Sequence, residues 1–99
     1  MVLVRDIFQL KFGKAKDAIA LWQEGKTIAQ EIGHGVADRL TTDLTGPYYR
    51  MVMESTHESL AAFEKSLGSI FKYEQWREWY SKFSPLIESG SREIYTIVD

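Results

Sequence analysis

The chain has 99 residues, of which 44% are hydrophobic and 26% charged, and its formal net charge at pH 7 is -2. Such a length predicts one domain, residues 1–99, around a single core. Twelve Lys and Arg residues are scattered and offset by fourteen acids, so we expect no nucleic-acid surface. The absence of cysteine excludes disulfides and thiolate chemistry. No uncharged run approaches the roughly 20 apolar residues of a membrane span, and the first residues do not resemble a signal peptide, so we expect a cytoplasmic location.

The first half of the chain predicts a strand, a helix and a hairpin. Residues Val2 to Lys11 are rich in β-branched and aromatic side chains, which is typical of a strand. From Lys14 to Ile32 the apolar residues recur at helical spacing, which predicts an amphipathic helix. Two extended stretches, Val36 to Leu44 and Tyr48 to Glu54, flank a short turn that contains Gly and Pro. We expect these stretches to pair antiparallel.

The second half predicts a helix in two parts and a last strand. Residues Ser55 to Glu58 match the capping-box pattern, so the helix is expected to begin near Thr56. Gly68-Ser69 interrupts it, and an aromatic segment resumes the helix to about Glu88. Residues Arg92 to Val98 are rich in strand-forming side chains. The resulting order is that of an α+β, ferredoxin-like βαββαβ fold with a four-stranded antiparallel sheet.

Both faces of the predicted sheet carry apolar side chains. The first strand places Val4 and Phe8 on one face and Leu3 and Ile7 on the other. Two helices cover only one face, and an exposed apolar face would be prone to association. We therefore expect a homodimer in which the sheets of two copies face each other. The alternative is that charged strand residues such as Arg5 make this face hydrophilic enough to stay exposed to solvent in a monomer.

An aromatic run near the end of the chain is the strongest candidate for a ligand site. Six of the thirteen aromatic residues lie between Phe71 and Phe83, and Trp76, Trp79, Tyr80 and Phe83 follow one another at i, i+3, i+4 and i+7. This spacing places them on one helix face. They either pack the core and dimer interface or form the wall of a cleft for a flat apolar ligand, because Trp and Tyr carry polar groups that need partners when buried.

Charged and tyrosine side chains in the predicted strands are further ligand-binding candidates. Arg39 or Arg50 would hold an anionic substrate through charge-assisted hydrogen bonds if it lines the cleft. Tyr49 and Tyr95 would supply a hydroxyl to the same cleft. The alternative is that the strand charges form salt bridges on the sheet or at the interface, because charges are not buried unpaired.

Three residues are candidates for proton transfer. His34 and His57 are the side chains whose ordinary pKa lies near physiological pH, and Asp6 lies in the first strand. A structural interpretation competes for both histidines, since His34 lies between two glycines at a helix end and His57 falls in the first turn of the next helix. Two histidines so far apart in sequence predict no metal site.

The chain resembles the dimeric α/β-barrel superfamily, in particular its NIPSNAP-like and antibiotic-biosynthesis-monooxygenase-like members. The resemblance covers essentially the whole chain. It rests on the element order, on the passage Leu44 to Ser55 leading into His57 to Phe63, and on the tail Ser91 to Tyr95 after a helix end at Pro85. It implies paired ferredoxin-like subunits, each with a ligand cleft between its sheet and its helices.

Members of this superfamily include cofactor-independent oxygenases and haem-degrading enzymes. Monooxygenase relatives often carry a tryptophan at the end of the third strand, where this chain has Glu54. Haem-degrading relatives use an asparagine on the first strand, and this chain contains no asparagine. Neither catalytic set is therefore carried over.

Three functions follow as hypotheses. The first is a small dimeric protein whose aromatic-lined cleft binds a flat apolar ligand, with cofactor-independent monooxygenation as its enzymatic form. The second is a non-catalytic binding or assembly module. The third is a haem-binding or haem-degrading protein; no cofactor is predicted, and haem stays open.

Overall fold

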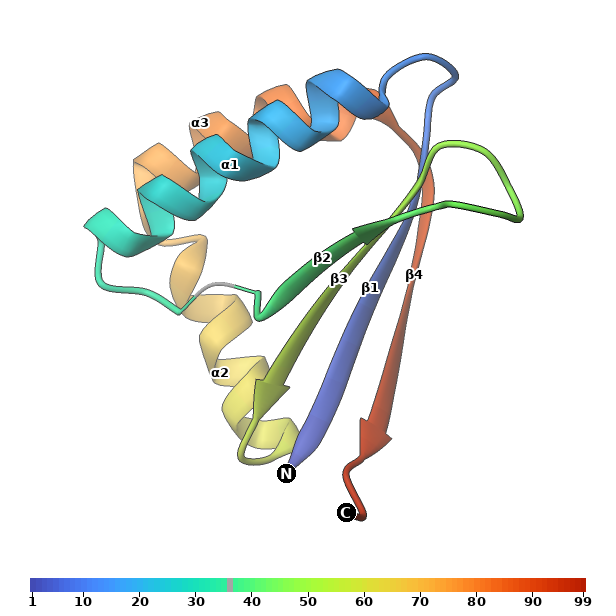
Figure 1. Ribbon diagram of the computed structural model, residues 1–99. Helices are drawn as coiled ribbons and strands as arrows, with labels where there is room; N and C mark the ends of the chain where they lie inside the picture. The colour runs from blue at the N-terminus through green and yellow to red at the C-terminus, as the bar shows by residue number, and fades with distance from the viewer. Residues whose placement is uncertain (36) are drawn as a thin grey trace.

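A computed structural model describes residues 1–35 and 37–99 and confirms the predicted α+β, ferredoxin-like fold with a four-stranded antiparallel sheet (Figure 1). Its elements are β1 (Val2–Leu10), α1 (Ala15–Glu31), β2 (Arg39–Thr42), β3 (Arg50–His57), α2 (Leu60–Ile70), α3 (Glu74–Phe83), the short 3-10 helix η1 (Ser84–Leu86) and β4 (Ile87–Thr96). Among the described residues, no helix is long and apolar enough to cross a membrane.

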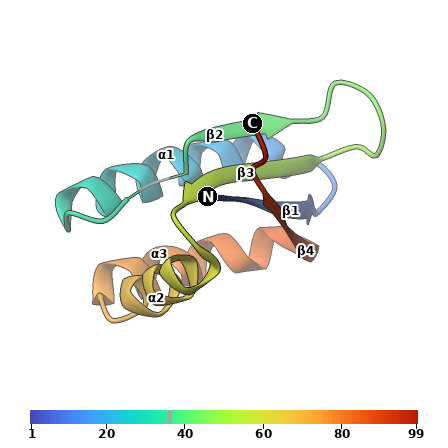
Figure 2. The ribbon, with the colours of Figure 1, turned by 90° about the horizontal axis from the view of Figure 1, so that it is seen from below.

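The sheet has the strand order β2-β3-β1-β4, so that β1 lies in its interior and β4 at one edge. Val4 of β1 pairs with Ser55 of β3 on one side and with Ile94 of β4 on the other. Directly paired residues point to the same face of a sheet, and successive residues alternate. The helices lie on one side of the sheet, which leaves its other side uncovered (Figures 1 and 2).

Both faces of the sheet carry apolar side chains, as the sequence pattern predicts. On the helix side Val4, Leu10 and Met51 are fully buried. On the opposite face, the pairing brings Ile7 next to Val52. This uncovered face also carries a chain of ion pairs, in which Glu54 accepts contacts from Arg5 at 3.4 Å and Arg39 at 2.8 Å, and Arg5 also contacts Glu93 at 3.0 Å. The salt bridges of Arg5, Arg39 and Glu54 therefore lie among apolar groups on the uncovered face.

Aromatic side chains of α3 fill the space between the sheet and α1. Trp79 stacks on Phe83 with ring centroids 5.0 Å apart, and Phe83 meets the edge of Phe8 from β1 at 5.6 Å. The indole N–H of Trp79 donates to the carbonyl of Leu21 in α1. Gly25 of α1 faces this indole, and the lack of a side chain there allows the two helices to approach.

The predicted start of the second helix is wrong. Strand β3 continues through His57, because its residues pair with β1 as far as Val2. The hydroxyl of Ser55 is therefore not a helix cap and instead contacts His57. Helix α2 begins at Leu60, and the cap is Ser59, whose Oγ accepts the backbone N–H of Ala62 at 3.1 Å.

Four other elements also differ from prediction. Helix α2 continues through Gly68, and the break falls after Ile70, since one helical glycine costs only about 1 kcal/mol relative to alanine. Helix α3 ends at Phe83 instead of Glu88, because Pro85 follows in η1 and lacks an N–H. Strand β4 starts at Ile87, five residues before the predicted start. Strand β2 is short, and position 36, where the predicted strand begins, lies outside the described residues.

Candidate functional site

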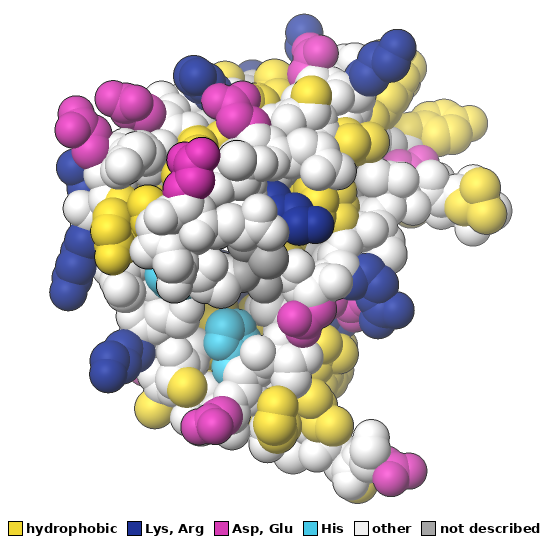
Figure 3. All heavy atoms as spheres, turned by 60° about the vertical axis from the view of Figure 1, so that its left-hand side comes forward, with side chains coloured by type: hydrophobic (Ala, Val, Ile, Leu, Met, Phe, Trp, Pro, Cys, Tyr) yellow, Lys and Arg dark blue, Asp and Glu magenta, His cyan; other side chains and the backbone are white. Residues whose placement is uncertain are grey.

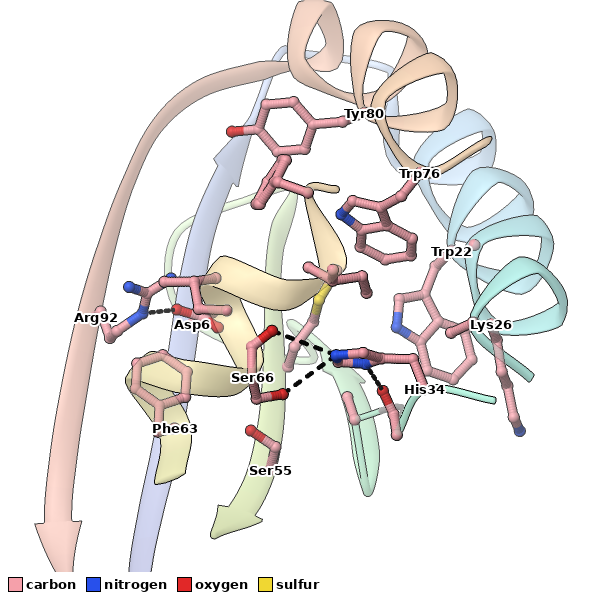
Figure 4. A pocket seen from close by; sticks show the side chains of 18 of the residues that line it. Asp6, Trp22, Lys26, His34, Ser55, Phe63, Ser66, Trp76, Tyr80 and Arg92 are labelled. Atoms are coloured by element: carbon pink, nitrogen blue, oxygen red, sulfur yellow. Dashed lines mark hydrogen bonds and ion pairs between the residues drawn. The ribbon is translucent and has the colours of Figure 1, made fainter. Parts of the chain in front are cut away.

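A cleft of about 1210 Å³ lies between the helix side of the sheet and the helices. Its floor is formed by residues of β1, β3 and β4, and its other walls come from α1, α2 and α3 (Figure 4). Ligand pockets usually measure roughly 300–1,000 Å³, so this cleft has room for a multi-ring organic molecule. This is the location that the resemblance implies.

The aromatic wall of the cleft comes from two helices that are distant in sequence. Trp22 of α1 and Trp76 of α3 lie next to each other in Figure 4, and Trp76 packs on Trp79 with ring centroids 4.5 Å apart. These are all three tryptophans of the chain, and each lines the cleft. At the end of this wall, the ammonium of Lys26 lies 5.4 Å from the Trp22 ring centroid, a cation–π contact.

Residues of the predicted aromatic stripe pack in the core and also line the cleft. Trp79 and Phe83 are 4% and 1% exposed and belong to the core, although their edges reach the cleft. Tyr80 is 44% exposed and meets the edge of Phe71. The indole nitrogen of Trp76 is shielded from solvent and has no hydrogen-bond partner among the described residues. A buried N–H without a partner is unfavourable by about 1–3 kcal/mol.

An ion pair lies across the cleft from the indoles. Arg92 Nε of β4 donates to Asp6 Oδ1 of β1 at 2.5 Å, and the guanidinium lies 4.9 Å from the ring centroid of Phe63 in α2. The partners occupy directly paired positions of the two strands. Asp6, a predicted proton acceptor, is thus engaged by a cation.

His57 and Ser55 form a second polar group on the floor of the cleft. Both lie on the helix-facing side of β3, two residues apart, and Ser55 Oγ lies 3.0 Å from His57 Nε2. The imidazole packs edge-on against Phe63, with centroids 5.1 Å apart. His57 therefore lies on a strand and lines the cleft, whereas the sequence predicts it in the first turn of a helix.

His34 connects the end of α1 to α2. Its Nδ1 lies 2.9 Å from the carbonyl oxygen of Gly35, and its Nε2 lies 3.2 Å from that of Ser66, whose hydroxyl is 3.4 Å away. Figure 3, which brings the side of α2 and the C-terminal end of α1 forward, shows histidine atoms at the surface. The bonding of His34 supports its structural interpretation, although the residue also lines the cleft.

Four predicted site residues lie elsewhere. Arg39 pairs with Glu54 on the uncovered face of the sheet, and Arg50 and Tyr95 belong to the same face by their strand register. Tyr49 precedes β3 with a φ of 60° and lines a separate hollow of about 430 Å³ beside Phe12. The alternation of the strands determines these positions, and a one-residue error in register exchanges the two faces.

Several residues of the cleft are not among the predicted site residues, including Trp22, Ser55, Phe63, Ser66 and Arg92. The sequence places Trp22 within the helix predicted from Lys14 to Ile32, Ser55 in a helix cap and Arg92 at the start of a strand, and it gives no site signal for Phe63 or Ser66. Their functional placement depends on the return of β4 beside β1 and on the position of α2 over the strand ends. Arg92 comes opposite Asp6 through the register of β4 against β1, which local sequence patterns do not specify.

Within the described residues, Nδ1 of His57 is the ring nitrogen of the cleft histidines that is left for a haem iron. Iron in haem is commonly bound by a histidine nitrogen. Both ring nitrogens of His34 and Nε2 of His57 already face protein hydrogen-bond partners. Within residues 1–35 and 37–99, no three His, Asp or Glu side chains come together as metal ligands.

No protein-family model and no curated protein matches the chain. Solved structures do. A NIPSNAP family protein from Agrobacterium tumefaciens has a TM-score of 0.89 at 20% identity, covering 99% of this chain and 86% of that chain. A NIPSNAP domain protein from Burkholderia xenovorans has a TM-score of 0.87 at 11% identity, covering 99% and 95%. An antibiotic biosynthesis monooxygenase has a TM-score of 0.73 at 15% identity, covering 100% of both chains. At these identities the similarity establishes the fold, and in this respect the predicted resemblance is confirmed.

Proposed function

We propose that the protein binds a flat, largely apolar organic molecule in the cleft between its sheet and helices. The observation that carries this proposal is the cleft itself, of about 1210 Å³, with indoles from two helices on one side and polar groups on its floor. Apolar walls with a few convergent polar groups are typical of small-molecule sites. The orphan indole N–H of Trp76 further supports a ligand that carries a hydrogen-bond acceptor.

The enzymatic form that we propose is cofactor-independent oxygenation of an electron-rich substrate. The cleft would hold the substrate away from bulk water, and a side chain would take a proton from it so that it reacts with dioxygen. Of the three predicted proton acceptors, Asp6 is held by Arg92, and His34 by two carbonyl groups. His57 is the best placed, since its one hydrogen bond within the described residues is to a serine hydroxyl.

We also propose that two copies associate through their uncovered sheet faces. This face displays Leu3, Ile7, Val52 and Tyr95, and no helix covers it. Light scattering should therefore give a mass of twice 11.4 kDa. Ile7→Arg should shift the protein toward a monomer, while Ile19→Arg, on the surface of α1, should not. A wild-type monomer at micromolar concentration would exclude the dimer.

Intrinsic fluorescence tests ligand binding directly, because every tryptophan lines the cleft. Flat aromatic compounds such as naphthalene and anthraquinone should change the emission saturably. Trp76→Ala should weaken binding roughly 2- to 12-fold, as expected for an aromatic contact of about 0.5–1.5 kcal/mol. The matched control is Phe12→Ala, since Phe12 is 80% exposed and outside the cleft.

The same titration separates the competing hypotheses. If no compound changes the emission, or if Trp76→Ala lowers only the stability, the aromatic wall is packing and the protein is a binding or assembly module. Substrate-dependent oxygen uptake that falls in His57→Gln would support the enzymatic form. A Soret band on haem titration that disappears in His57→Ala would instead favour haem binding.

A further inference from the structure

The Asp6–Arg92 pair presents hydrogen-bonding groups to the cleft that the protein does not use. Arg92 Nε and Asp6 Oδ1 bond to each other, and the side chains remain 40% and 23% exposed. Within residues 1–35 and 37–99, the terminal guanidinium nitrogens and Asp6 Oδ2 have no other hydrogen-bond partner. Arg92 Cζ lies over the ring of Phe63, 4.9 Å from its centroid, and the N–H groups of the planar guanidinium point outward from its edge. The pair thus places a hydrogen-bond donor, the Arg92 guanidinium, next to a hydrogen-bond acceptor, Asp6 Oδ2.

The charges that line the cleft do not favour an anion. The guanidinium charge is compensated by the carboxylate beside it. Among the lining residues the acids outnumber the bases by three to two: Asp6, Asp38 and Glu64 against Lys26 and Arg92. A carboxylate near Arg92 would also approach Asp6, and like charges repel at this range. An uncharged group meets no such penalty.

We propose that the Asp6–Arg92 pair binds an uncharged polar group of the ligand that both donates and accepts a hydrogen bond, such as a primary amide. The inference rests on the proposed function, since it concerns the ligand of the same cleft. The amide oxygen accepts from Arg92, and the amide N–H donates to Asp6 Oδ2. The aromatic part of the ligand lies against Trp22 and Trp76, on the opposite side of the cleft (Figure 4). The ligand is therefore an aromatic amide or a related neutral compound, bound in one orientation.

Three matched probes test this preference by isothermal titration calorimetry: naphthalene-2-carboxamide, naphthalene-2-carboxylate and 2-methylnaphthalene. The amide should bind roughly 3- to 10-fold more tightly than the hydrocarbon, as expected for a net gain of one hydrogen bond. The carboxylate should bind less tightly than the amide. Equal affinity of the amide and the hydrocarbon overturns the inference and leaves the proposed function intact. If none of the probes binds, both fail.

Two variants test the role of charge compensation. Asp6→Asn leaves the positive charge of Arg92 uncompensated. The affinity for naphthalene-2-carboxylate should therefore rise roughly 10-fold, which makes it the tightest-binding of the three probes. Arg92→Gln should abolish the advantage of the amide and leave the carboxylate the weakest. Asp17→Asn makes the same change on the exposed surface of α1 and should leave the order unchanged.

Circular dichroism of each variant reports whether it folds. If Asp6→Asn does not fold, Arg92→Gln provides an independent test. The inference is overturned if the wild-type protein prefers the carboxylate, if a folded Asp6→Asn variant keeps the wild-type order of affinities, or if the amide keeps its advantage over the hydrocarbon in a folded Arg92→Gln variant. A purely structural role of the ion pair would weaken the three probes alike and would not reorder them.

Discussion

Replacing Gly25 by alanine should destabilise the protein, although alanine is the better helix former. A Cβ atom at this position would lie 2.6, 2.8 and 2.9 Å from three atoms of the Trp79 indole. The ring has little room to retreat, since it packs between Trp76 at 4.5 Å and Phe83 at 5.0 Å. Movement would also break its hydrogen bond to Leu21.

The expected change in the free energy of unfolding combines two costs and one gain. Overpacking of a core costs about 1–3 kcal/mol, and the lost hydrogen bond of Trp79 about 1 kcal/mol. The higher helix propensity of alanine returns about 1 kcal/mol. We expect a net loss of about 2 kcal/mol for Gly25→Ala, which corresponds to a decrease in Tm of roughly 8–16 °C for a domain of this size.

Gly68→Ala is the matched control. Gly68 also lies inside a helix, but a Cβ there would meet nothing within 4 Å. This substitution should stabilise the protein by about 0.5–1 kcal/mol. Urea and thermal unfolding of the three proteins, followed by circular dichroism, measure both effects. If the two substitutions shift stability equally, the contact between Gly25 and Trp79 does not constrain the helices, and the reasoning is refuted.

Three further substitutions probe the core, a helix terminus and the uncovered sheet face. Phe83→Ala removes a side chain that is 1% exposed and should lower the free energy of unfolding by about 3–5 kcal/mol in urea; a loss below about 1 kcal/mol would contradict its place in the core. Ser59→Ala should cost about 1 kcal/mol through the lost cap of α2, with Ser59→Asp as a variant that retains stability. Glu54→Gln leaves Arg5 and Arg39 without their shared carboxylate and should cost about 1 kcal/mol; the loss should shrink in 1 M salt, and salt-independent destabilisation would argue against an electrostatic cause.

Much of the fold was predictable because its signals are local. The helical spacing from Lys14 to Ile32 required no knowledge of distant residues, and α1 agrees with it to within one residue at each end. The errors fall where pairing with another strand overrides a local motif. Residues Ser55 to Glu58 match a helix cap, yet hydrogen bonding to β1 keeps the chain extended as far as His57. Ile87 joins β4 for the same reason.

The site was predictable only in part. The helical spacing of Trp76 and Tyr80 places them on one face without reference to any partner, and that face lines the cleft. Arg39 and Arg50 illustrate the limit, because which sheet face a strand residue occupies depends on register. Trp22 shows a second limit: its apolar character identifies a buried helix face but does not distinguish packing from a ligand-binding wall.

The central position of β1 has a consequence for how the protein folds. Asp6 and Arg92 are 86 residues apart in sequence, and β1 has unpaired hydrogen-bonding groups on one side until β4 arrives. Contacts of such long sequence separation carry a large loop-closure entropy and slow folding. An intermediate that lacked β4 would expose the edge of β1, where another chain could pair with it. The pairing of β4 with β1 thus brings Arg92 to Asp6 and covers the edge of β1 in the same step.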